Sequence, residues 1–216
     1  MTISEPSDSS PRTDDPCPHS LPGHAADTSA PTGRAAVFLD RDGVINIDDG
    51  YTHRPDHFVF MPGIFEICRA AQREGFRLVI VTNQAGIGRG YYDVAAFALL
   101  TQWMLERFAQ ERIHVDRVYF CPHHPQSGLG PYRRDCDYRK PNPGMLQAAC
   151  ADLDLDPTRC IFIGDKPGDM VAGASAGVAR LALLSSEPCE LPGHVLIRKT
   201  SLPELQAALF PSVSGN

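Results

Sequence analysis

The sequence predicts a doubly wound α/β domain with a mostly parallel sheet. Short apolar runs, which are typical of buried strands, alternate along the chain with segments whose apolar residues recur at helical spacing. Strands and helices that alternate in this way are joined by right-handed crossovers, which place helices on both faces of the sheet. In such folds ligands bind beyond the carboxyl ends of the strands. The residues that directly follow the apolar runs are Asp40, Thr82, Cys121 and Asp165.

The expected elements follow one another from residue 35 onward. Residues 35–39 form the first strand, and the helical pattern of 64–73 stops at Gly75, which suits a C-terminal cap. Asp93 is placed to cap a helix that runs to about Gln110. The other expected strands are 78–81, 118–120, 161–163, 180–184 and 195–197, and the other helices are 145–153, 169–176 and a last one opened by Ser201 and Glu204.

The first 34 residues differ in composition from the rest of the chain. They are rich in Ser, Pro, Asp, Thr and Gly and have almost no aliphatic side chains. Such a segment buries too little apolar area to offset the entropy lost when it is ordered. We therefore expect a disordered tail over residues 1–34 and a single domain over 35–216, with no inserted cap domain.

Composition excludes several classes of function. The chain has 216 residues, 43% of them hydrophobic, and a net charge of −6, so it has no broad basic surface for a nucleic acid. No apolar run approaches the roughly 18 residues of a membrane span, and the N-terminus lacks the basic and apolar regions of a signal peptide. The seven cysteines, an odd number, fit a reducing compartment. We expect a cytoplasmic monomer.

A pair of carboxylates follows the first strand, in Asp40-Arg41-Asp42-Gly43. A carboxylate at a strand end is a nucleophile for phosphorus if a divalent cation neutralises it and the incoming phosphate. Gly43 permits a sharp turn, so Asp42 can face the same site and act as general acid and base. A solvated acidic turn is the alternative interpretation of this motif alone.

Three further motifs are suited to phosphoryl chemistry. Thr82-Asn83-Gln84 follows a strand, and its hydroxyl and loop amides can hold phosphoryl oxygens. Arg139-Lys140 precedes a helix and offers cations to phosphate. Asp165 can complete a magnesium site with Asp40, while Asp169 supports it or caps the next helix. An ordinary turn and a solvated basic pair are the alternatives for the first two.

In this order the four motifs resemble those of the haloacid dehalogenase phosphatases: D-x-D-G, a Thr or Ser after the second strand, a Lys, and G-D-x-x-x-D. The stretches FLDRDGVINIDDGYTHRPDHFVFMPG, VTNQAGIGRGYY, CPHHP and RKPNPGM are similar to those of the cap-less D-glycero-D-manno-heptose 1,7-bisphosphate 7-phosphatases. The resemblance covers Ala35 to about Phe210. It implies a haloacid dehalogenase-like Rossmannoid fold and a sugar bisphosphate substrate, in the synthesis of nucleotide-activated heptose for lipopolysaccharide or surface glycans.

The resemblance also assigns roles by position. Asp40 would be the nucleophile that forms an aspartyl phosphate, and Asp42 the general acid and base. Thr82 and Lys140 would steady the phosphoryl group. Mg²⁺ would be held by Asp40, the backbone carbonyl of Asp42, and Asp165. The substrate site would be lined by Asp48, Asp49, Gly50, Tyr51, Thr82, Asn83, Gln84, Ala85, Arg139, Lys140 and Lys166.

The zinc loop of that family is incomplete in this sequence. Its pattern is C-x-H, a loop, and C-x-C before R-K-P; Cys121, His123 and Cys136 match the first three ligands. Tyr138 stands where the fourth is expected. A structural zinc site normally closes with four N or S ligands. The candidates for a replacement are His124, Asp135, Asp137 and water; alternatively, the loop holds no Zn²⁺.

Three other functions fit the sequence less well. A histidinol-phosphate phosphatase shares the motifs, but the loop from Asp48 to His53 matches the heptose type better. A non-catalytic interaction protein on the same fold does not require the intact Asp40, Asp42, Lys140 and Asp165. A zinc-ribbon nucleic-acid module conflicts with the acidic net charge and the incomplete ligand set.

Overall fold

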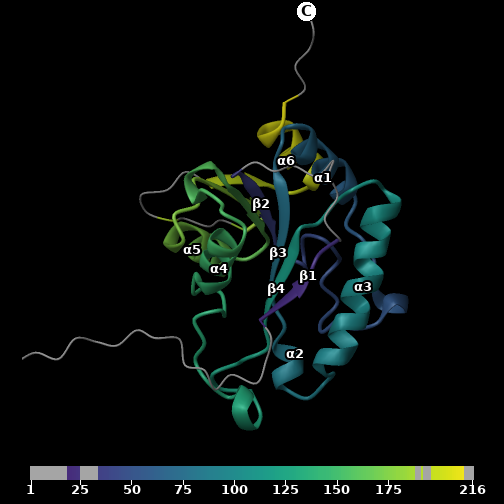
Figure 1. Cartoon of the computed structure of the whole chain (residues 1–216), viewed down its shortest axis with the longest axis vertical. Helices are drawn as coiled ribbons and strands as arrows, with labels where there is room; N and C mark the ends of the chain where they lie inside the picture. Colours follow the sequence, from purple (N-terminus) through teal and green to yellow (C-terminus); the bar gives the residue numbers. More distant parts are fainter. Residues whose placement is uncertain (1–18, 25–33, 188–190, 192–195, 212–216) are drawn as a thin grey trace, which may run out of the picture.

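The computed structural model describes residues 19–24, 34–187, 191 and 196–211, and these residues form a layered α/β fold around one sheet (Figure 1). The seven strands lie in the order β1-β4-β3-β2-β5-β6-β7, and every neighbouring pair is parallel except β1 with β4. The strands are β1 (Ser20–Pro22), β2 (Ala36–Leu39), β3 (Arg77–Asn83), β4 (Arg117–Cys121), β5 (Ile161–Gly164), β6 (Arg180–Leu184) and β7 (Leu196–Lys199).

The helices connect these strands in the alternating order that the sequence predicts. The α-helices are α1 (Ile64–Arg73), α2 (Ala85–Gly88), α3 (Val94–Gln110), α4 (Gly144–Asp152), α5 (Pro167–Ser175) and α6 (Leu202–Leu209). Three short 3₁₀ turns are η1 (Pro55–His57), η2 (Gly130–Tyr132) and η3 (Pro157–Arg159). Within the described residues, no second domain interrupts this order, so the expectation of a cap-less fold is confirmed.

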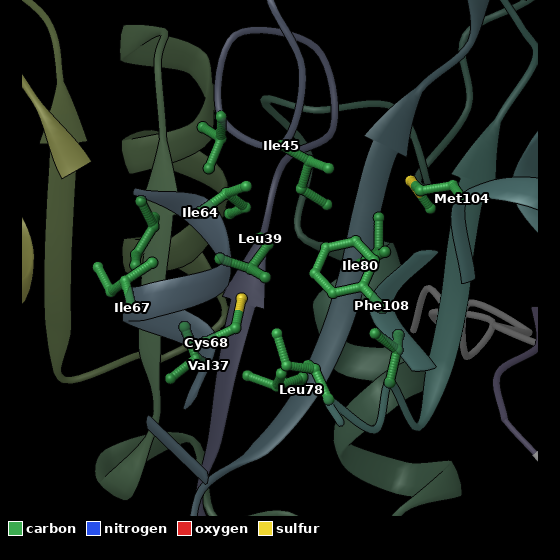
Figure 2. Close-up of a cluster of buried hydrophobic side chains, with 14 of the residues drawn as sticks. Val37, Leu39, Ile45, Ile64, Ile67, Cys68, Leu78, Ile80, Met104 and Phe108 are labelled. Carbon is green, nitrogen blue, oxygen red and sulfur yellow. The ribbon is translucent and has the colours of Figure 1, made fainter. Parts of the chain in front are cut away.

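The sheet is buried on both faces because successive side chains of a strand point to opposite sides. In β2, Val37 and Leu39 face the layer that contains α1, α3 and α6, whereas Ala36 and Phe38 face α4 and α5. All four are at most 1% exposed. Figure 2 shows the first of these two cores, in which Leu39 packs among side chains of helix α1 and the neighbouring strand.

Local sequence explains the helix ends that were predicted best. Helix α1 has the expected bounds because its apolar residues form one stripe, and Gly75 follows it with a φ of 80°. Helix α3 begins after Asp93, whose side chain accepts a hydrogen bond from the Ala96 amide at 2.8 Å. Helix α6 begins after Ser201 as expected. In a capping box Glu204 would accept a hydrogen bond from the Ser201 amide, but here it accepts one from the Thr200 amide, at 3.2 Å.

The expectation that residues 1–34 are a disordered tail is wrong for residues 19–24. Strand β1 pairs antiparallel with the outer edge of β4 (Figure 1). The Phe120 amide donates to the carbonyl of His19 at 2.9 Å, and the ring of His24 bonds the backbone of Val115 and Leu105 at 2.7 and 2.8 Å. The segment gains order from pairing an open strand edge, which its own composition does not reveal. Residues 1–18 and 25–33 lie outside the described residues.

The site-forming edge of the sheet is set by its topology. From β2 at the centre, the chain proceeds through β3 and β4 in one direction and through β5, β6 and β7 in the other. The order therefore reverses between β2 and β5, where a doubly wound sheet opens a crevice at its carboxyl edge. Asp40 and Asp165 follow these two strands. Among the described residues, no helix is long and apolar enough to cross a membrane.

Candidate active site

Three carboxylates and one lysine meet at the reversal point of the sheet. Asp40 follows β2, Asp165 follows β5, and Asp169 lies in the first turn of α5; each has an oxygen within 4.8 Å of the other two. Nζ of Lys140 lies 2.9 Å from Oδ2 of Asp40 and 2.7 Å from Oδ1 of Asp169, and it donates to the carbonyl of Val81 at 3.0 Å. The lysine therefore holds the carboxylate of Asp40 in a fixed direction.

Burial controls the charge of this cluster. Burial raises the pKa of Asp40 to about 7 against the opposing effect of Lys140, and the charges of Asp169 and Asp165 add to the rise. Burial likewise raises the pKa of Asp165 to about 6. Burial alone would lower the pKa of Lys140, but Asp169 and Asp40 raise it overall, so the lysine remains charged. Lys166 adds a longer ion pair, with its Nζ 3.7 Å from Oδ2 of Asp165, but this lysine is shared with Asp48.

Asp42 is oriented by a different set of donors. Arg41, which is only 1% exposed, donates to both carboxylate oxygens of Asp42 at 2.8 Å and to the carbonyl of Thr52 at 2.8 Å. Asn46 adds a bond at 3.0 Å. Gly43, with a φ of 89°, makes the turn that the sequence predicts, and a Cβ there would lie 2.2 Å from Oδ2 of Asp165. The clamp by Arg41 was not predicted.

Gln84 links Asp42 to the end of β3. Its Nε2 donates to Asp42 at 3.1 Å and to Oγ1 of Thr82 at 2.8 Å, and its Oε1 accepts from the hydroxyl of Tyr92 at 2.6 Å. Asn83 fixes the other side, because its amide exchanges hydrogen bonds of 3.0 and 3.1 Å with the backbone of Lys140. The motif at the end of β3, of which Thr82 and Asn83 still belong to the strand, thus positions groups of two other motifs.

A cavity of about 580 Å³ opens above these side chains. Most of the expected site residues line it: Asp40, Asp42, Asp48, Gly50, Tyr51, Asn83, Gln84, Ala85, Arg139, Lys140 and Lys166. Asp48 and Lys166 form an ion pair of 3.0 Å across one wall. Asp49 instead lines a separate, shallower pocket, and Thr82 is buried beneath Gln84. Four residues of the wall had no role expected from the sequence: Gly86, Arg89, Tyr92 and Gly168. His124 was expected only as a candidate zinc ligand, and Asp169 as a support of the magnesium site or as a helix cap.

A cluster of two arginines, Arg89 and Arg139, lines the same cavity. His124 lines it too, but burial and the charges of the two arginines lower the pKa of its imidazole, so it does not add a cation. Burial lowers the pKa of Arg139, and the charge of Arg89 lowers it further. Nη1 of Arg89 donates to the hydroxyl of Tyr51, but Nε of Arg89 is buried with no hydrogen-bond partner among the described residues. Within the described chain neither arginine pairs with a carboxylate, so the cluster is suited to an anionic group of a ligand.

The residues that match the zinc loop also come together. Sγ of Cys121 lies 3.7 Å from Nδ1 of His123. Hydrogen bonds from the Cys121 thiol and from His123 lower the pKa of Cys136 below the ordinary thiol value. A fourth residue, His19, has a ring nitrogen within 4.8 Å of both His123 and Cys136. Tyr138 lies beside this group and stacks on the ring of His19, with centroids 4.4 Å apart.

The carboxylate cluster fits a divalent cation. Oδ1 of Asp165 is buried and has no hydrogen-bond partner among the described residues, so it is open to a further ligand. The all-oxygen donor set of Asp40, Asp165 and Asp169 is the kind that Mg²⁺ takes, since Mg²⁺ binds few carboxylates and keeps water and phosphate oxygens. Asp169, for which the sequence predicts a role as support of the site or as helix cap, also accepts a hydrogen bond from the backbone amide of Lys166 at 3.0 Å.

Known proteins resemble both the sequence and the fold. The haloacid dehalogenase-like hydrolase family matches residues 24–177. The D-glycero-alpha-D-manno-heptose-1,7-bisphosphate 7-phosphatase of Burkholderia mallei is 52% identical over 149 residues, which are 69% of this chain and 79% of that protein. The D-glycero-beta-D-manno-heptose-1,7-bisphosphate 7-phosphatase of Vibrio cholerae is 45% identical over 164 residues, 76% of this chain and 88% of that protein.

Two crystal structures support the same relationship. A protein from Mesorhizobium loti, proposed to be a HAD-like phosphatase, has a TM-score of 0.79 and 38% identity and covers 90% of this chain and 94% of its own. The D,D-heptose 1,7-bisphosphate phosphatase of B. bronchiseptica, complexed with magnesium and phosphate, has a TM-score of 0.67 and 28% identity over 81% of this chain and 97% of its own. The motifs, the fold and the relatives agree: the chain belongs to the haloacid dehalogenase-like hydrolase family.

Proposed function

We propose that this protein is a magnesium-dependent phosphatase that removes the 7-phosphate of D-glycero-D-manno-heptose 1,7-bisphosphate. One observation carries the substrate class: a single cavity is lined both by Asp40 with Lys140 and by the arginines Arg89 and Arg139. A sugar with two phosphates presents an anion to each. The names of the relatives from Burkholderia mallei and Vibrio cholerae support the same substrate.

The reaction follows from the two carboxylates. Asp40 attacks phosphorus, the bond between phosphorus and the sugar oxygen breaks, and Asp42 donates a proton to that oxygen. Water then attacks the aspartyl phosphate and gives its proton to Asp42, which releases inorganic phosphate and restores Asp40. Lys140 holds Oδ2 of Asp40 at 2.9 Å and presents a charge to the transferring phosphoryl oxygens. Arg41 and Gln84 keep Asp42 in place.

Mg²⁺ is the cofactor that we propose for this site. Asp40, Asp165 and the backbone carbonyl of Asp42 would hold it, with Asp169 beside them. When bound, it neutralises the nucleophile and the phosphate and so supplies the charge compensation that Lys140 alone does not give. The B. bronchiseptica structure contains magnesium together with phosphate. We also propose a structural Zn²⁺ at Cys121, His123 and Cys136, away from the reacting atoms.

Selectivity would come from the loops around the cavity, since no cap domain covers the described site. The loop that contains Asp48, Gly50 and Tyr51 lines the cavity together with Lys166, and its polar groups can bond sugar hydroxyls. A site built for such bonds rejects a substrate that lacks the hydroxyls, because its own polar groups then stay unpaired. Histidinol phosphate has neither these hydroxyls nor a second phosphate.

A phosphate-release assay with Mg²⁺ tests the proposal directly. The substrates are both anomers of the heptose 1,7-bisphosphate, histidinol phosphate and p-nitrophenyl phosphate, and ³¹P NMR shows which phosphate leaves. We expect kcat/KM for a heptose bisphosphate to exceed that for histidinol phosphate by at least about a hundredfold, the order expected for one or two lost charge-assisted contacts. The Asp40→Asn variant, purified in parallel, controls for contaminating phosphatases.

The outcomes separate the parts of the proposal. If histidinol phosphate is the better substrate, the heptose assignment fails and the phosphatase assignment stands. If the 1-phosphate leaves first, the orientation of the sugar in the cavity is the reverse of the one proposed. If no ester loses phosphate above the level of the Asp40→Asn control, the phosphatase assignment itself fails.

A further inference from the structure

We propose that His19, which precedes strand β1, completes the zinc site in place of the missing fourth ligand of the loop. The site would then have two sulfur and two nitrogen ligands: Cys121, Cys136, His123 and His19. This inference concerns the N-terminal segment, and it does not depend on which phosphate ester the active site accepts.

Three of the four proposed ligand atoms lie close enough together for one metal ion, and Cys121 adjoins one of the three. A ring nitrogen of His19, a ring nitrogen of His123 and Sγ of Cys136 all lie within 4.8 Å of one another, and Sγ of Cys121 lies 3.7 Å from Nδ1 of His123. Bonds of about 2.0–2.1 Å to nitrogen and 2.3 Å to sulfur, at tetrahedral angles, place a nitrogen and a sulfur about 3.5 Å apart. The donor types, two thiols and two imidazoles, are those of closed structural zinc sites.

Tyr138 explains why a histidine can take the place of a cysteine. Its ring stacks on that of His19, with centroids 4.4 Å apart and planes inclined by 27°. A cysteine at position 138 would be too short to make this contact. The residue that removes the fourth ligand of the loop therefore packs against the proposed replacement and holds its imidazole beside His123, whose ring centroid is 5.6 Å from that of His19.

The backbone of His19 is held at the correct place by the sheet. The Phe120 amide donates to its carbonyl at 2.9 Å, next to the ligand Cys121 in the chain. β1 then pairs with β4 from Ser20 to Pro22, and the ring of His24 anchors the far end of the segment to Val115. A ligand on a paired strand is presented with less loss of entropy than one on a free tail.

The zinc site would connect the N-terminal segment to the cavity. The Arg139 amide donates to the carbonyl of Cys136 at 2.9 Å, and its Nη1 donates to the carbonyl of His123 at 3.0 Å. Arg139 lines the cavity, so two proposed zinc ligands also fix a cavity arginine through their carbonyl groups. Within the described chain, this is the path by which a residue outside the predicted domain reaches the active site.

The test uses the full-length protein loaded with Zn²⁺ or with Co²⁺ as a spectroscopic probe. In His19→Ala we expect zinc release to a chelator at least about a hundredfold faster than in the wild type, since the loss of a direct ligand costs at least as much as the loss of a supporting residue. The d–d absorption of the cobalt form should weaken, because the metal is no longer held by four protein ligands. His57→Ala is the matched control: this imidazole is 64% exposed and remote from the loop.

A rescue variant separates ligation from folding. His19→Ala combined with Tyr138→Cys restores the ligand pattern of the family and should regain slow zinc release. Tyr138→Cys alone should retain zinc as well as the wild type does, because His19 already closes the site. X-ray absorption of the zinc-loaded wild type should show two imidazoles and two sulfurs. A wild type that binds no stoichiometric zinc, a spectrum with one imidazole, or unchanged release from His19→Ala would each overturn the proposal.

Discussion

The carboxyl group of Asp40 is buried, yet the reaction proposed for it requires a negative charge. Its Oδ1 accepts the Arg41 amide at 2.7 Å and its Oδ2 lies 2.9 Å from Lys140, so its orientation is fixed. Charge is a separate matter, because Lys140 is shared with Asp169 and burial raises the pKa of Asp40 to about 7. The orientation of the carboxyl group is thus fixed by the protein alone, whereas its ionisation is not. A bound cation would favour the ionised form, which is the nucleophile.

Replacing Asp40 with asparagine tests its role at this scale. We expect kcat to fall by at least about a hundredfold, because an amide is neither a nucleophile for phosphorus nor a good ligand for Mg²⁺. The fold should persist, since the Arg41 amide can still donate to the amide oxygen. Initial rates of phosphate release measure the first effect and thermal denaturation the second. Retention of more than about a hundredth of the wild-type kcat would remove Asp40 from the mechanism.

Arg89 is the residue of the cavity that the sequence analysis missed and the substrate proposal needs. In Arg89→Ala we expect kcat/KM for the heptose bisphosphate to fall by about tenfold to a hundredfold, the value of a hydrogen bond to a charged group. The value for p-nitrophenyl phosphate, which has one phosphate, should change little. Arg73→Ala is the control, because Arg73 is exposed in the last turn of α1. Equal losses on both esters would mean that Arg89 does not serve a second phosphate.

At the scale of elements, the sequence predicts well where local pattern decides the structure. Helices α1 and α3 have an apolar stripe and suitable end residues. The bounds of α1 and the start of α3 were predicted to the residue, and the end of α3 was predicted at about the correct place. The motif residues after β2, β3 and β5 converge because parallel strands end at one edge, which is a property of the fold class. These features depend only on neighbours in the chain or on the strand order.

Contacts between segments that are far apart in the chain could not be predicted from the sequence. β1 has no periodic pattern in its three residues and depends on the edge of β4. Arg89 lies in a glycine-rich turn that matched no phosphate-binding motif, and it reaches the cavity through the short helix α2, which was not predicted. His19 is remote in sequence from Cys136, so no spacing rule brings the two together. Each of these features requires the assembled fold.

Strand β1 leads to a prediction about truncation. Removal of residues 1–33 should lower Tm by about 3–8 °C, because it exposes the edge of β4 and removes the anchoring bonds of His24, a loss of about 1–2 kcal/mol for a chain of this size. Removal of residues 1–18 leaves the paired segment in place and is the matched control. Both proteins are compared by thermal denaturation with a zinc chelator present, so that metal binding does not contribute.

The truncation gives a clear result in either direction. An unchanged Tm after removal of residues 1–33 would show that β1 adds nothing to stability and that the tail is dispensable, as composition alone suggests. An equal loss in both truncated proteins would place the stabilising contacts before residue 19 instead. Circular dichroism at low temperature checks that each truncated protein is folded before it is heated.

At the scale of the whole molecule, both proposed metal sites lie at one edge of the sheet. The carboxylate cluster occupies the reversal point between β2 and β5, and the zinc loop follows β4, two strands away. Between them, Asn83 and Lys140 exchange backbone and side-chain hydrogen bonds. Helices cover both faces of the sheet and bury its apolar side chains, so the carboxyl edge is where polar groups of several segments can meet outside the core.

The charge of this edge predicts how stability depends on pH. The folded-state pKa values of Asp40 and Asp165 are raised from 3.8 to about 7 and about 6. Between pH 3.8 and these folded-state values the folded chain binds more protons than the unfolded chain. This part of the stability is therefore fully present below pH 3.8, decreases as pH rises, and is lost once pH has passed about 6 for Asp165 and about 7 for Asp40. Without Mg²⁺, Tm should fall between pH 5.5 and pH 8, and Asp40→Asn should show a smaller fall.

The stabilisation that Mg²⁺ provides should have the opposite dependence on pH. Binding requires both carboxylates to be ionised, so protons compete with Mg²⁺ at low pH and the apparent affinity should be at least about tenfold weaker at pH 5.5 than at pH 8. The rise in Tm caused by a fixed excess of MgCl₂ should consequently be several degrees larger at pH 8, since ligand binding stabilises the fold in proportion to the logarithm of ligand concentration over Kd. NaCl at equal ionic strength controls for screening. The same increase at both pH values would mean that Mg²⁺ does not bind between Asp40 and Asp165.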